Sequence, residues 1–307
     1  MSLELFLEAL ADPDTKVPAS DFVEVSDLHP DELGQFARAW FGLPVDRQRW
    51  IVSTMVDLAE DTPELDFGAI FKMCLKDGDE QVLEKAMEGL WEHEERSVIP
   101  GLIHVLHSDK GSQVRSAAAV ALGKFPVLVL EGKLLAKDGE SIHDSLMEVL
   151  QDDTQPAEVR RRSLEAIAPF NTADIKRLVE RAYQSSDLKL KSSAIYAMGR
   201  TGDMDWLPLL IKEMQSPEPD IRYETAHACG ELGEEDAVPH LIPLLEDDDY
   251  QVQMAGVSAL GKIGSPLAKK VLMNCVKDGD AALEDAARAE LQNIELLEDP
   301  MSFSSEV

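Results

Sequence analysis

The residues in this sequence best suited to chemistry are histidines, tyrosines and carboxylates that lie a few positions apart. His104 and His107 are three residues apart, so on a helix they would share one face and could bind a metal ion together. No third ligand is spaced to join them, which favours histidines at a surface or an interface. Tyr223, Glu224 and His227 would similarly bring a phenol, a carboxylate and an imidazole close together, where they could contact a bound molecule.

Signatures of the common catalytic sites are absent from the sequence. There is no G-x-S-x-G nucleophile motif and no G-x-x-x-x-G-K-[ST] phosphate loop, and the GKIGS segment at 261–265 has the wrong spacing for one. The acidic run at 246–249 lacks the glycine and glutamate positions of an EF-hand loop. We therefore expect a protein that is not an enzyme and that holds neither a metal nor a cofactor.

Net charge narrows the choice of partners. The 307 residues include 59 Asp and Glu but only 29 Lys and Arg, which gives a net charge of −30, and 44% of the residues are hydrophobic, enough for a folded core. Nucleic acids and anionic membranes would repel such a chain. We therefore expect a protein or peptide partner rather than nucleic acid or membrane. The sequence leaves the oligomeric state open.

The N-terminal segment and the cysteines indicate a compartment. The first residues, MSLELFLEALADPD, carry acids where a signal peptide has positive charge, and no stretch approaches the roughly 18 apolar residues expected of a membrane span. Cys74, Cys229 and Cys275 are odd in number, far apart and in apolar surroundings, so we expect three buried thiols. These features predict a protein of the reducing cytoplasm.

A ten-residue pattern recurs along most of the chain. It begins at seven anchor residues: Val82, Val114, Val159, Leu190, Ile221, Val252 and Leu283. The last five anchors are each 31 residues apart, whereas 45 residues separate Val114 from Val159, which is one period plus an insertion of 14. Apolar or small residues four, five, seven and eight positions after each anchor form one face of a helix, which we call helix B.

Both ends of helix B are marked in the sequence. Aspartates three positions before the anchor can cap the first turn: Asp79, Asp187, Asp249 and Asp280. Glycines twelve positions after it suit a left-handed helix end: Gly202, Gly233 and Gly264. A helix A precedes each helix B, with proline in the first turn at Pro100, Pro208 and Pro239. Such hairpins bury their apolar faces only by stacking, so we expect an all-α fold, a right-handed α-solenoid of about seven hairpins.

The pattern resembles HEAT repeats of the short phycobilisome-lyase type, which read roughly V-R-x-x-A-A-x-A-L-G followed by a helix beginning A-V-P-x-L-I-x-L-L. The closest stretch is IRYETAHACGELGEEDAVPHLIPLLEDDDYQVQMAGVSALGKIG at 221–264, and the resemblance covers about residues 66–297. It implies the solenoid fold but little about function, because the family includes scaffolds, chromophore lyases and a hydroxylase.

The hydroxylase of that class, deoxyhypusine hydroxylase, places His-Glu pairs two and three residues after the anchor in several repeats, where they converge on two metals. In this chain only Tyr223-Glu224 comes near that pattern, and it lacks the histidine. The one His-Glu dipeptide, His93-Glu94, is predicted to lie in a turn beyond its helix. The resemblance therefore gives no reason to expect a di-iron site here.

The repeat period also divides the chain. We predict an N-terminal helical cap at 1–62, a HEAT-like array at 63–297 with an insertion at 125–138, and a flexible acidic tail at 298–307. The cap brings four large aromatic residues, which either close the end of the array or form a docking surface: Phe36, Trp40, Phe41 and Trp50. The apolar run at 127–130 reads as a loop that either packs back on the array or contacts a partner.

The residues two and six positions after each anchor should face away from the core of the array. In a solenoid, helix B normally lines the concave side, and there a partner would meet aromatic, Arg and Met side chains, which are enriched in binding hot spots. The residues that we predict to contact a partner are Arg161, Tyr196, Tyr223, Glu224, His227 and Met254. The alternative is that they make ordinary half-buried contacts between repeats.

Charge along the chain is uneven. Residues 156–200 hold nine bases and five acids, a local charge of +4 in a chain of −30. Either these bases bridge to acids of neighbouring repeats, or an acidic partner or an anionic ligand docks there. Taken together, the sequence predicts a non-catalytic scaffold or adaptor that binds a protein or peptide. The alternative is a lyase-like or chaperone-like protein that holds a chromophore or cofactor, with Tyr223, Glu224 and His227 as polar contacts.

Overall fold

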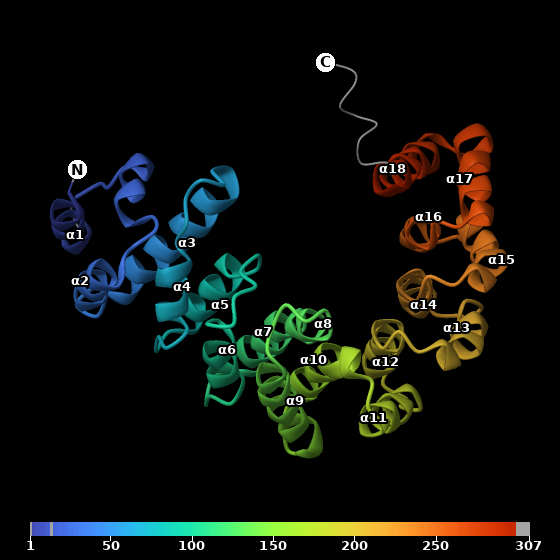
Figure 1. The fold of residues 1–307 in the computed structure, drawn as a ribbon, viewed down its shortest axis with the longest axis horizontal. Coiled ribbons are helices and arrows are strands. Elements are labelled where there is room, and N and C mark those ends of the chain that lie inside the picture. The colour runs from blue at the N-terminus through green and yellow to red at the C-terminus, as the bar shows by residue number, and fades with distance from the viewer. Residues whose placement is uncertain (1, 13–14, 299–307) are drawn as a thin grey trace. The chain divides into compact units, whose positions relative to one another are not determined.

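Helices make up all the regular structure in the part of the chain that is described. The computed structural model describes residues 2–12 and 15–298, apart from the side chain of residue 278 (Figure 1). The chain divides into two compact units, one ending at Ala166 and the other beginning at Ile167. The acidic tail that we predicted at 298–307 falls, after its first residue, outside the described residues.

The first unit begins with four helices and continues as helical hairpins. The leading elements are α1 (Leu3–Ala11), the 3-10 helix η1 (Ala19–Val25), α2 (Pro30–Trp40) and α3 (Val45–Asp61). They are followed by α4 (Gly68–Cys74), α5 (Glu80–Gly89), α6 (Ile99–Leu106), α7 (Ser112–Leu122), α8 (Phe125–Leu130), α9 (Ala136–Gln151) and α10 (Ala157–Ile167). Helices α4 and α5 pack together, as do α6 and α7, and α5 also contacts α7.

Most of the aromatic residues of the predicted cap are internal. Phe36 and Trp40 are each 1% exposed and stack with ring centroids 5.8 Å apart, and the Trp40 indole donates to Asp77 Oδ2 at 2.7 Å. Trp50 lies edge-on to Phe22 and carries the guanidinium of Arg47 over its ring at 4.5 Å. Of the four aromatic residues that we singled out, two are exposed, Phe41 at 73% and Trp50 at 37%. This packing favours a closing role for the region over an aromatic docking surface.

The insertion forms regular structure instead of the predicted loop. Its apolar run belongs to α8, in which Phe125, Pro126 and Leu128 are buried and which packs on α9. Residues 131–135 form a turn, and the last three residues of the insertion, 136–138, are the start of α9. The run was read as a loop because it interrupts the repeat period, although its proline is well suited to the first turn of a helix. The run therefore packs back on its own unit, while Leu130 stays 63% exposed.

The stretch Ser112–Leu130 corrects one expectation about membranes. By length and composition it could cross a bilayer, although we expected no such stretch. In the structure it comprises α7 and α8, and Val114, Ala118, Leu122 and Phe125 are completely buried. Buried core helices pass the same test of length and composition, so this stretch is weak support for a membrane span.

The second unit consists of two rows of helices. They are the 3-10 helix η2 (Ala168–Phe170), α11 (Ala173–Tyr183), α12 (Leu188–Arg200), η3 (Met204–Trp206), α13 (Leu207–Glu213), α14 (Pro219–Leu232), η4 (Glu235–Ala237), α15 (Val238–Leu241), η5 (Ile242–Glu246), α16 (Tyr250–Ile263), α17 (Pro266–Asp278) and α18 (Ala281–Glu298). Helices α12, α14, α16 and α18 pack side by side as one row, and α11, α13, α15 and α17 each pack on the helix that follows (Figure 1). With the packed pairs α4–α5 and α6–α7, and with α9 and α10 consecutive along the chain, these helices confirm the predicted α-solenoid of about seven hairpins.

The predicted helix ends are confirmed. All four capping aspartates accept N–H groups of the following turn: Asp79, Asp187, Asp249 and Asp280. Gly202, Gly233 and Gly264 adopt positive φ angles of 64°, 73° and 59°. The three cysteines are buried free thiols, as predicted, and burial raises the pKa of Cys229 to about 12. Local sequence signals therefore determine where these helices begin and end.

Side chains one position after the anchor connect neighbouring hairpins of the second unit. Lys191 Nζ contacts Glu213 Oε2 at 2.8 Å, and the guanidinium of Arg222 binds both carboxylate oxygens of Asp247 at 2.6 and 2.7 Å. Gln253 donates to the backbone oxygen of Asp247 at 2.6 Å. Lys191 and Arg222 thus reach from helix B to the end of helix A of the next hairpin, whereas Gln253 contacts the turn before its own helix. The first two contacts fix the spacing of successive hairpins.

The Arg222–Asp247 pair should make the stability of the second unit depend on pH. Its hydrogen bond to Arg222 is the main reason why the pKa of Asp247 is lowered. A lowered carboxyl pKa stabilises the fold above the pKa of the unfolded chain, about 4, and this contribution is lost as pH falls through the folded value. We expect Asp247→Asn to lower the free energy of unfolding by about 1–2 kcal/mol at pH 7. Urea unfolding from pH 7 to pH 3 should show the difference from wild type shrinking below about pH 4; a difference that is constant with pH would contradict this role.

Candidate functional site

Five of the six predicted partner-binding residues lie together on the second unit. Tyr196 is on α12, Tyr223, Glu224 and His227 are on α14, and Met254 is on α16, and these three helices pack side by side. Tyr196 is 38% exposed and Tyr223 is 37% exposed. The other three are partly buried. We call the surface formed by these residues of α12, α14 and α16 the helix-B face.

Arg161 is the predicted residue that does not join this face. It lies on α10 in the first unit, whereas the other five belong to the second unit. Its guanidinium contacts Glu158 Oε1 at 2.7 Å and Glu165 Oε1 at 3.2 Å, one turn to either side on the same helix, and its side chain is only 16% exposed. The structure therefore places Arg161 within an ion-pair network of its own helix.

Tyr223 and His227 form the centre of the helix-B face. Their rings meet edge to face with centroids 4.6 Å apart and an interplanar angle of 67°. Burial, followed by repulsion from Lys262, lowers the pKa of His227 despite the attraction of Glu231. The imidazole is therefore neutral at pH 7. Lys262 itself pairs with Glu231 at the edge of the face, which joins α16 to α14.

Two further exposed residues extend this face and were missed by the sequence analysis. Leu188 is 48% exposed and precedes Tyr196 by two helical turns, and Tyr250 is 56% exposed and precedes Met254 by four residues. Positions four apart share a helix face. Extending the anchor rule by one turn toward the start of each helix would have identified both. The helix-B face thus carries three exposed tyrosines and a leucine.

Backbones approach closely beneath the helix-B face. A Cβ atom on Gly199 of α12 would lie 2.7 Å from the Cα of Ala228 on α14, and one on Gly230 of α14 would lie 2.9 Å from the Cα of Ala259 on α16. Contacts this short leave no room for a side chain, so glycine is required at both positions. The three helices are held at a fixed small separation, and the side chains of the face stand on a rigid surface.

A buried polar cluster supports α12 from the other row. Tyr183 donates to Glu213 Oε1 at 2.5 Å, Lys191 binds Glu213 Oε2 at 2.8 Å, and the Lys191 ammonium lies 5.0 Å from the centroid of the Tyr183 ring. Burial, followed by the bond to Glu213, raises the pKa of Tyr183 to about 12. Glu213 is only 7% exposed. The phenol therefore stays protonated, and the cluster joins α11, α12 and α13.

The positive segment at 156–200 is largely neutralised within the fold. Six of its nine bases form ion pairs with carboxylates: Arg160, Arg161, Arg162, Lys176, Arg177 and Lys191. Lys176 and Lys191 reach acids of the next hairpin, at Asp203 and Glu213. This pairing favours the bridging interpretation of the segment over a docking site for an anionic ligand.

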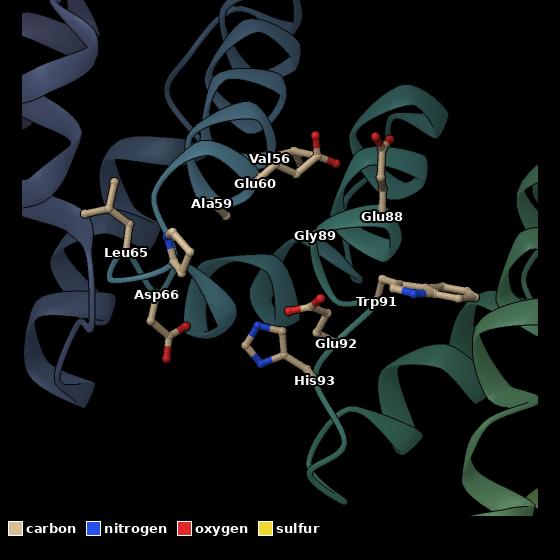
Figure 2. A pocket seen from close by; sticks show the side chains of 11 residues that line it. Val56, Ala59, Glu60, Leu65, Asp66, Glu88, Gly89, Trp91, Glu92 and His93 are labelled. Carbon is tan, nitrogen blue, oxygen red and sulfur yellow. The ribbon is translucent and has the colours of Figure 1, made fainter. Parts of the chain in front are cut away.

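The first unit holds a pocket that the sequence analysis did not identify. It has a volume of about 480 Å³ and lies between the end of α3, the segment that leads into α4, and the end of α5 with the residues after it. Its lining residues are Val56, Ala59, Glu60, Pro63, Leu65, Asp66, Glu88, Gly89, Trp91, Glu92 and His93. In Figure 2, Glu60 and Glu88 lie on one side of the opening and Glu92 and His93 on the other.

The rim of this pocket is held in place by nearby bases. Lys124 donates to the backbone oxygens of Leu90 and Trp91 at 3.0 and 2.5 Å, which fixes the chain where it leaves α5. His93 contacts Glu95 Oε1 at 3.3 Å, and the same oxygen binds Lys72 at 2.9 Å. The Trp91 side chain extends outward from the rim and is 65% exposed (Figure 2).

Metal ligands do not gather at either site. Among the described residues, no three His, Cys, Asp or Glu side chains are placed to hold a metal ion. His107, one of the two histidines that we considered as a metal pair, contacts Ser145 Oγ through Nε2 at 2.8 Å. The helix-B face and the pocket therefore offer aromatic, apolar and charged contacts for binding.

Comparisons with known proteins identify the repeat. A family model for HEAT repeats matches residues 207–292. No curated protein matches the sequence. Similar solved structures include the CpcE–CpcF complex of phycocyanin lyase from Nostoc, which is 19% identical, covers 76% of this chain and 94% of that chain, and gives a TM-score of 0.48. Human deoxyhypusine hydroxylase in complex with glycerol is 18% identical over 95% of this chain and 96% of that chain, with a TM-score of 0.37. None of these similarities carries information about function.

Proposed function

From its HEAT repeats and its α-solenoid fold, we propose that this chain is a non-catalytic scaffold that binds a protein or peptide on the helix-B face. HEAT repeats present rows of helices as extended surfaces, and this use suits recognition of another chain. The proposal includes a cytoplasmic location and a partner that is neither nucleic acid nor membrane, for which the net charge of −30 is the support.

The exposure of tyrosines on adjacent helices is the observation that carries the proposal. Tyr196, Tyr223 and Tyr250 keep 38%, 37% and 56% of their surface exposed, on three neighbouring helices of one row. A helix face that meets only water usually carries charged residues. Exposed aromatic residues on a rigid surface are typical of binding hot spots, because they bury a large area and lose little conformational freedom.

Removing either of the two predicted tyrosines should weaken partner capture without unfolding the protein. We expect Tyr196→Ala and Tyr223→Ala each to weaken binding by tenfold or more, because a hot-spot side chain contributes about 2 kcal/mol. The melting temperature should stay close to that of wild type, since both side chains are only partly buried. The measurement is retention of partners from a lysate of the source organism on the immobilised protein, together with thermal melting.

Met273→Ala is the matched control for these variants. Met273 is 50% exposed on α17, in the other row of helices, so its removal should leave capture unchanged. A large loss of stability with unchanged capture in the tyrosine variants would refute the proposal. It would instead assign the tyrosines to contacts between repeats.

The alternative function, a lyase-like or chaperone-like protein that holds a chromophore, stays a prediction. Its support is the edge-to-face pair of Tyr223 and His227, a polar and aromatic centre that a flat ligand could contact. A visible absorbance band on protein purified from its source organism would favour this alternative. Its absence, combined with capture of a protein through the helix-B face, would favour the scaffold.

A further inference from the structure

We infer that the pocket of the first unit is a second binding site, which takes an arginine side chain from a basic segment of a partner protein. This inference goes beyond the helix-B face, since it concerns other residues in the other unit. At about 480 Å³ the pocket lies within the range of known ligand sites. It is therefore large enough for a long side chain with part of its backbone.

The charge of the lining selects a cation. Four of the lining residues are acids, Glu60, Asp66, Glu88 and Glu92, and neither lysine nor arginine is among them. Asp66 accepts the backbone N–H of Gly68 at 2.7 Å, and Glu88 pairs with Lys85 at 2.7 Å. In the described part of the chain, Glu60 and Glu92 form no ion pair. Glu60 lies on α3 and Glu92 in the turn after α5, and the two lie on opposite sides of the opening (Figure 2).

The bases near the pocket form hydrogen bonds or ion pairs with other groups. Lys124 binds two backbone oxygens, Lys72 binds Glu95, and the guanidinium of Arg96 contacts Asp138 Oδ1 at 2.8 Å. None of the three is among the residues that line the pocket. Lys124 is also attracted by Glu92 through space, so the charge of Glu92 is partly compensated. Neutralisation of Glu60 is left to a cation supplied from outside the chain.

The shape of the site favours arginine over a simple ion. Val56, Ala59 and Leu65 give the pocket an apolar part that suits the methylene stem of a long side chain. A planar guanidinium can donate to two carboxylates at once and is less strongly hydrated than an ammonium. The ring of Trp91 extends from the rim, where the residue next to the arginine would lie against it (Figure 2).

Titration with short peptides tests this site directly. The probe is acetyl-Gly-Gly-Arg-Gly-Gly-amide, and its neutral control carries citrulline, which has nearly the same shape, in place of arginine. Two-dimensional NMR of the ¹⁵N-labelled full chain would follow the Trp91 indole N–H and the amides of Glu92 and His93. We expect saturable shifts of these signals with the arginine peptide. The citrulline peptide should bind about tenfold more weakly, because its neutral side chain cannot form charge-assisted hydrogen bonds to the carboxylates.

Variants separate this site from general attraction to an acidic protein. The double variant Glu60→Gln/Glu92→Gln should weaken binding of the arginine peptide by tenfold or more. Both side chains are exposed, so the fold should persist. Glu148→Gln removes an exposed acid on α9 that does not line the pocket and should change nothing. Tyr196→Ala with Tyr223→Ala should also leave this peptide bound, so that failure of one site is distinguishable from failure of the other.

The inference would be overturned by equal shifts with the citrulline peptide, by equal weakening with Glu148→Gln, or by the same shifts produced by Mg²⁺ at matched ionic strength. A lysine peptide that binds more tightly than the arginine peptide would also overturn the assignment to a guanidinium.

Discussion

Glu213→Ala is expected to lower the free energy of unfolding of the second unit by about 3 kcal/mol. Glu213 is 7% exposed and binds both the Lys191 ammonium and the Tyr183 hydroxyl. Its removal leaves an ammonium and a phenol without their acceptor in a largely buried place, and desolvated polar groups without partners are strongly destabilising. Urea unfolding, with hydrogen exchange of α11, α12 and α13 as a local readout, measures the loss.

Two further variants separate charge from packing in this cluster. Glu213→Gln keeps an acceptor for Tyr183 but removes the negative charge that pairs with Lys191. Its free energy of unfolding should therefore lie between those of wild type and Glu213→Ala. Replacing both partners, Lys191→Met with Glu213→Leu, should recover most of the stability, because no unpaired charge remains. A double variant as unstable as Glu213→Ala would contradict the assignment of the loss to an uncompensated charge.

The stabilising effect of Glu213 should also disappear in acid. Burial raises the pKa of this carboxyl, but the bonds to Lys191 and Tyr183 outweigh burial, so its net pKa is lowered. The contribution is therefore complete above the pKa of the unfolded glutamate, about 4.3, and is lost as pH falls through the folded value. The difference between wild type and Glu213→Gln should narrow below about pH 4.

Gly199→Ala is expected to lower the free energy of unfolding of the second unit by about 2 kcal/mol. The added Cβ would lie 2.7 Å from the Cα and 3.0 Å from the Cβ of Ala228. These are atoms of a helix backbone and its first side-chain carbon, so no rotamer change can relieve the contact. Helices α12 and α14 must separate, which loosens the surface that carries Tyr196 and Tyr223. Urea unfolding and faster hydrogen exchange in both helices would measure the effect.

The matched control for Gly199→Ala should raise the free energy of unfolding instead of lowering it. Gly34 lies inside α2 with open space where its Cβ would be. Gly34→Ala should therefore stabilise the first unit by up to about 1 kcal/mol through helix propensity alone. If Gly199→Ala were also stabilising, the close approach of the two helices would not be a constraint on the array.

Local signals made most of the fold predictable from the sequence. The capping aspartates, the glycines with positive φ and the prolines in first turns act within a few residues of their own helix ends. The period of 31 residues then fixed the number of hairpins. The position two residues after the anchor was exposed at Tyr223 but buried at Ser116 of α7. The rule for which side chains face outward therefore held less well than the rule for where helices lie.

Features built from distant segments could not be predicted in this way. The pocket of the first unit combines the end of α3 with the residues after α5, and the Tyr183–Glu213–Lys191 cluster draws on three helices. Neither spacing nor composition indicates which of the many acids meet in space. Arg161 was assigned to the partner surface although its spacing to Glu158 and Glu165 is that of ion pairs within one helix.

Site-specific photocrosslinking tests the central claim, binding through the helix-B face, most directly. A benzophenone amino acid would replace residue 196 or 223, and as controls residue 242 or 273. Ile242 and Met273 are similarly exposed, at 43% and 50%, on elements of the other row. We predict that irradiation in the source organism gives an adduct with the same partner protein from positions 196 and 223 and none from 242 and 273. Equal adducts from all four positions, or adducts from the control positions alone, would contradict the account.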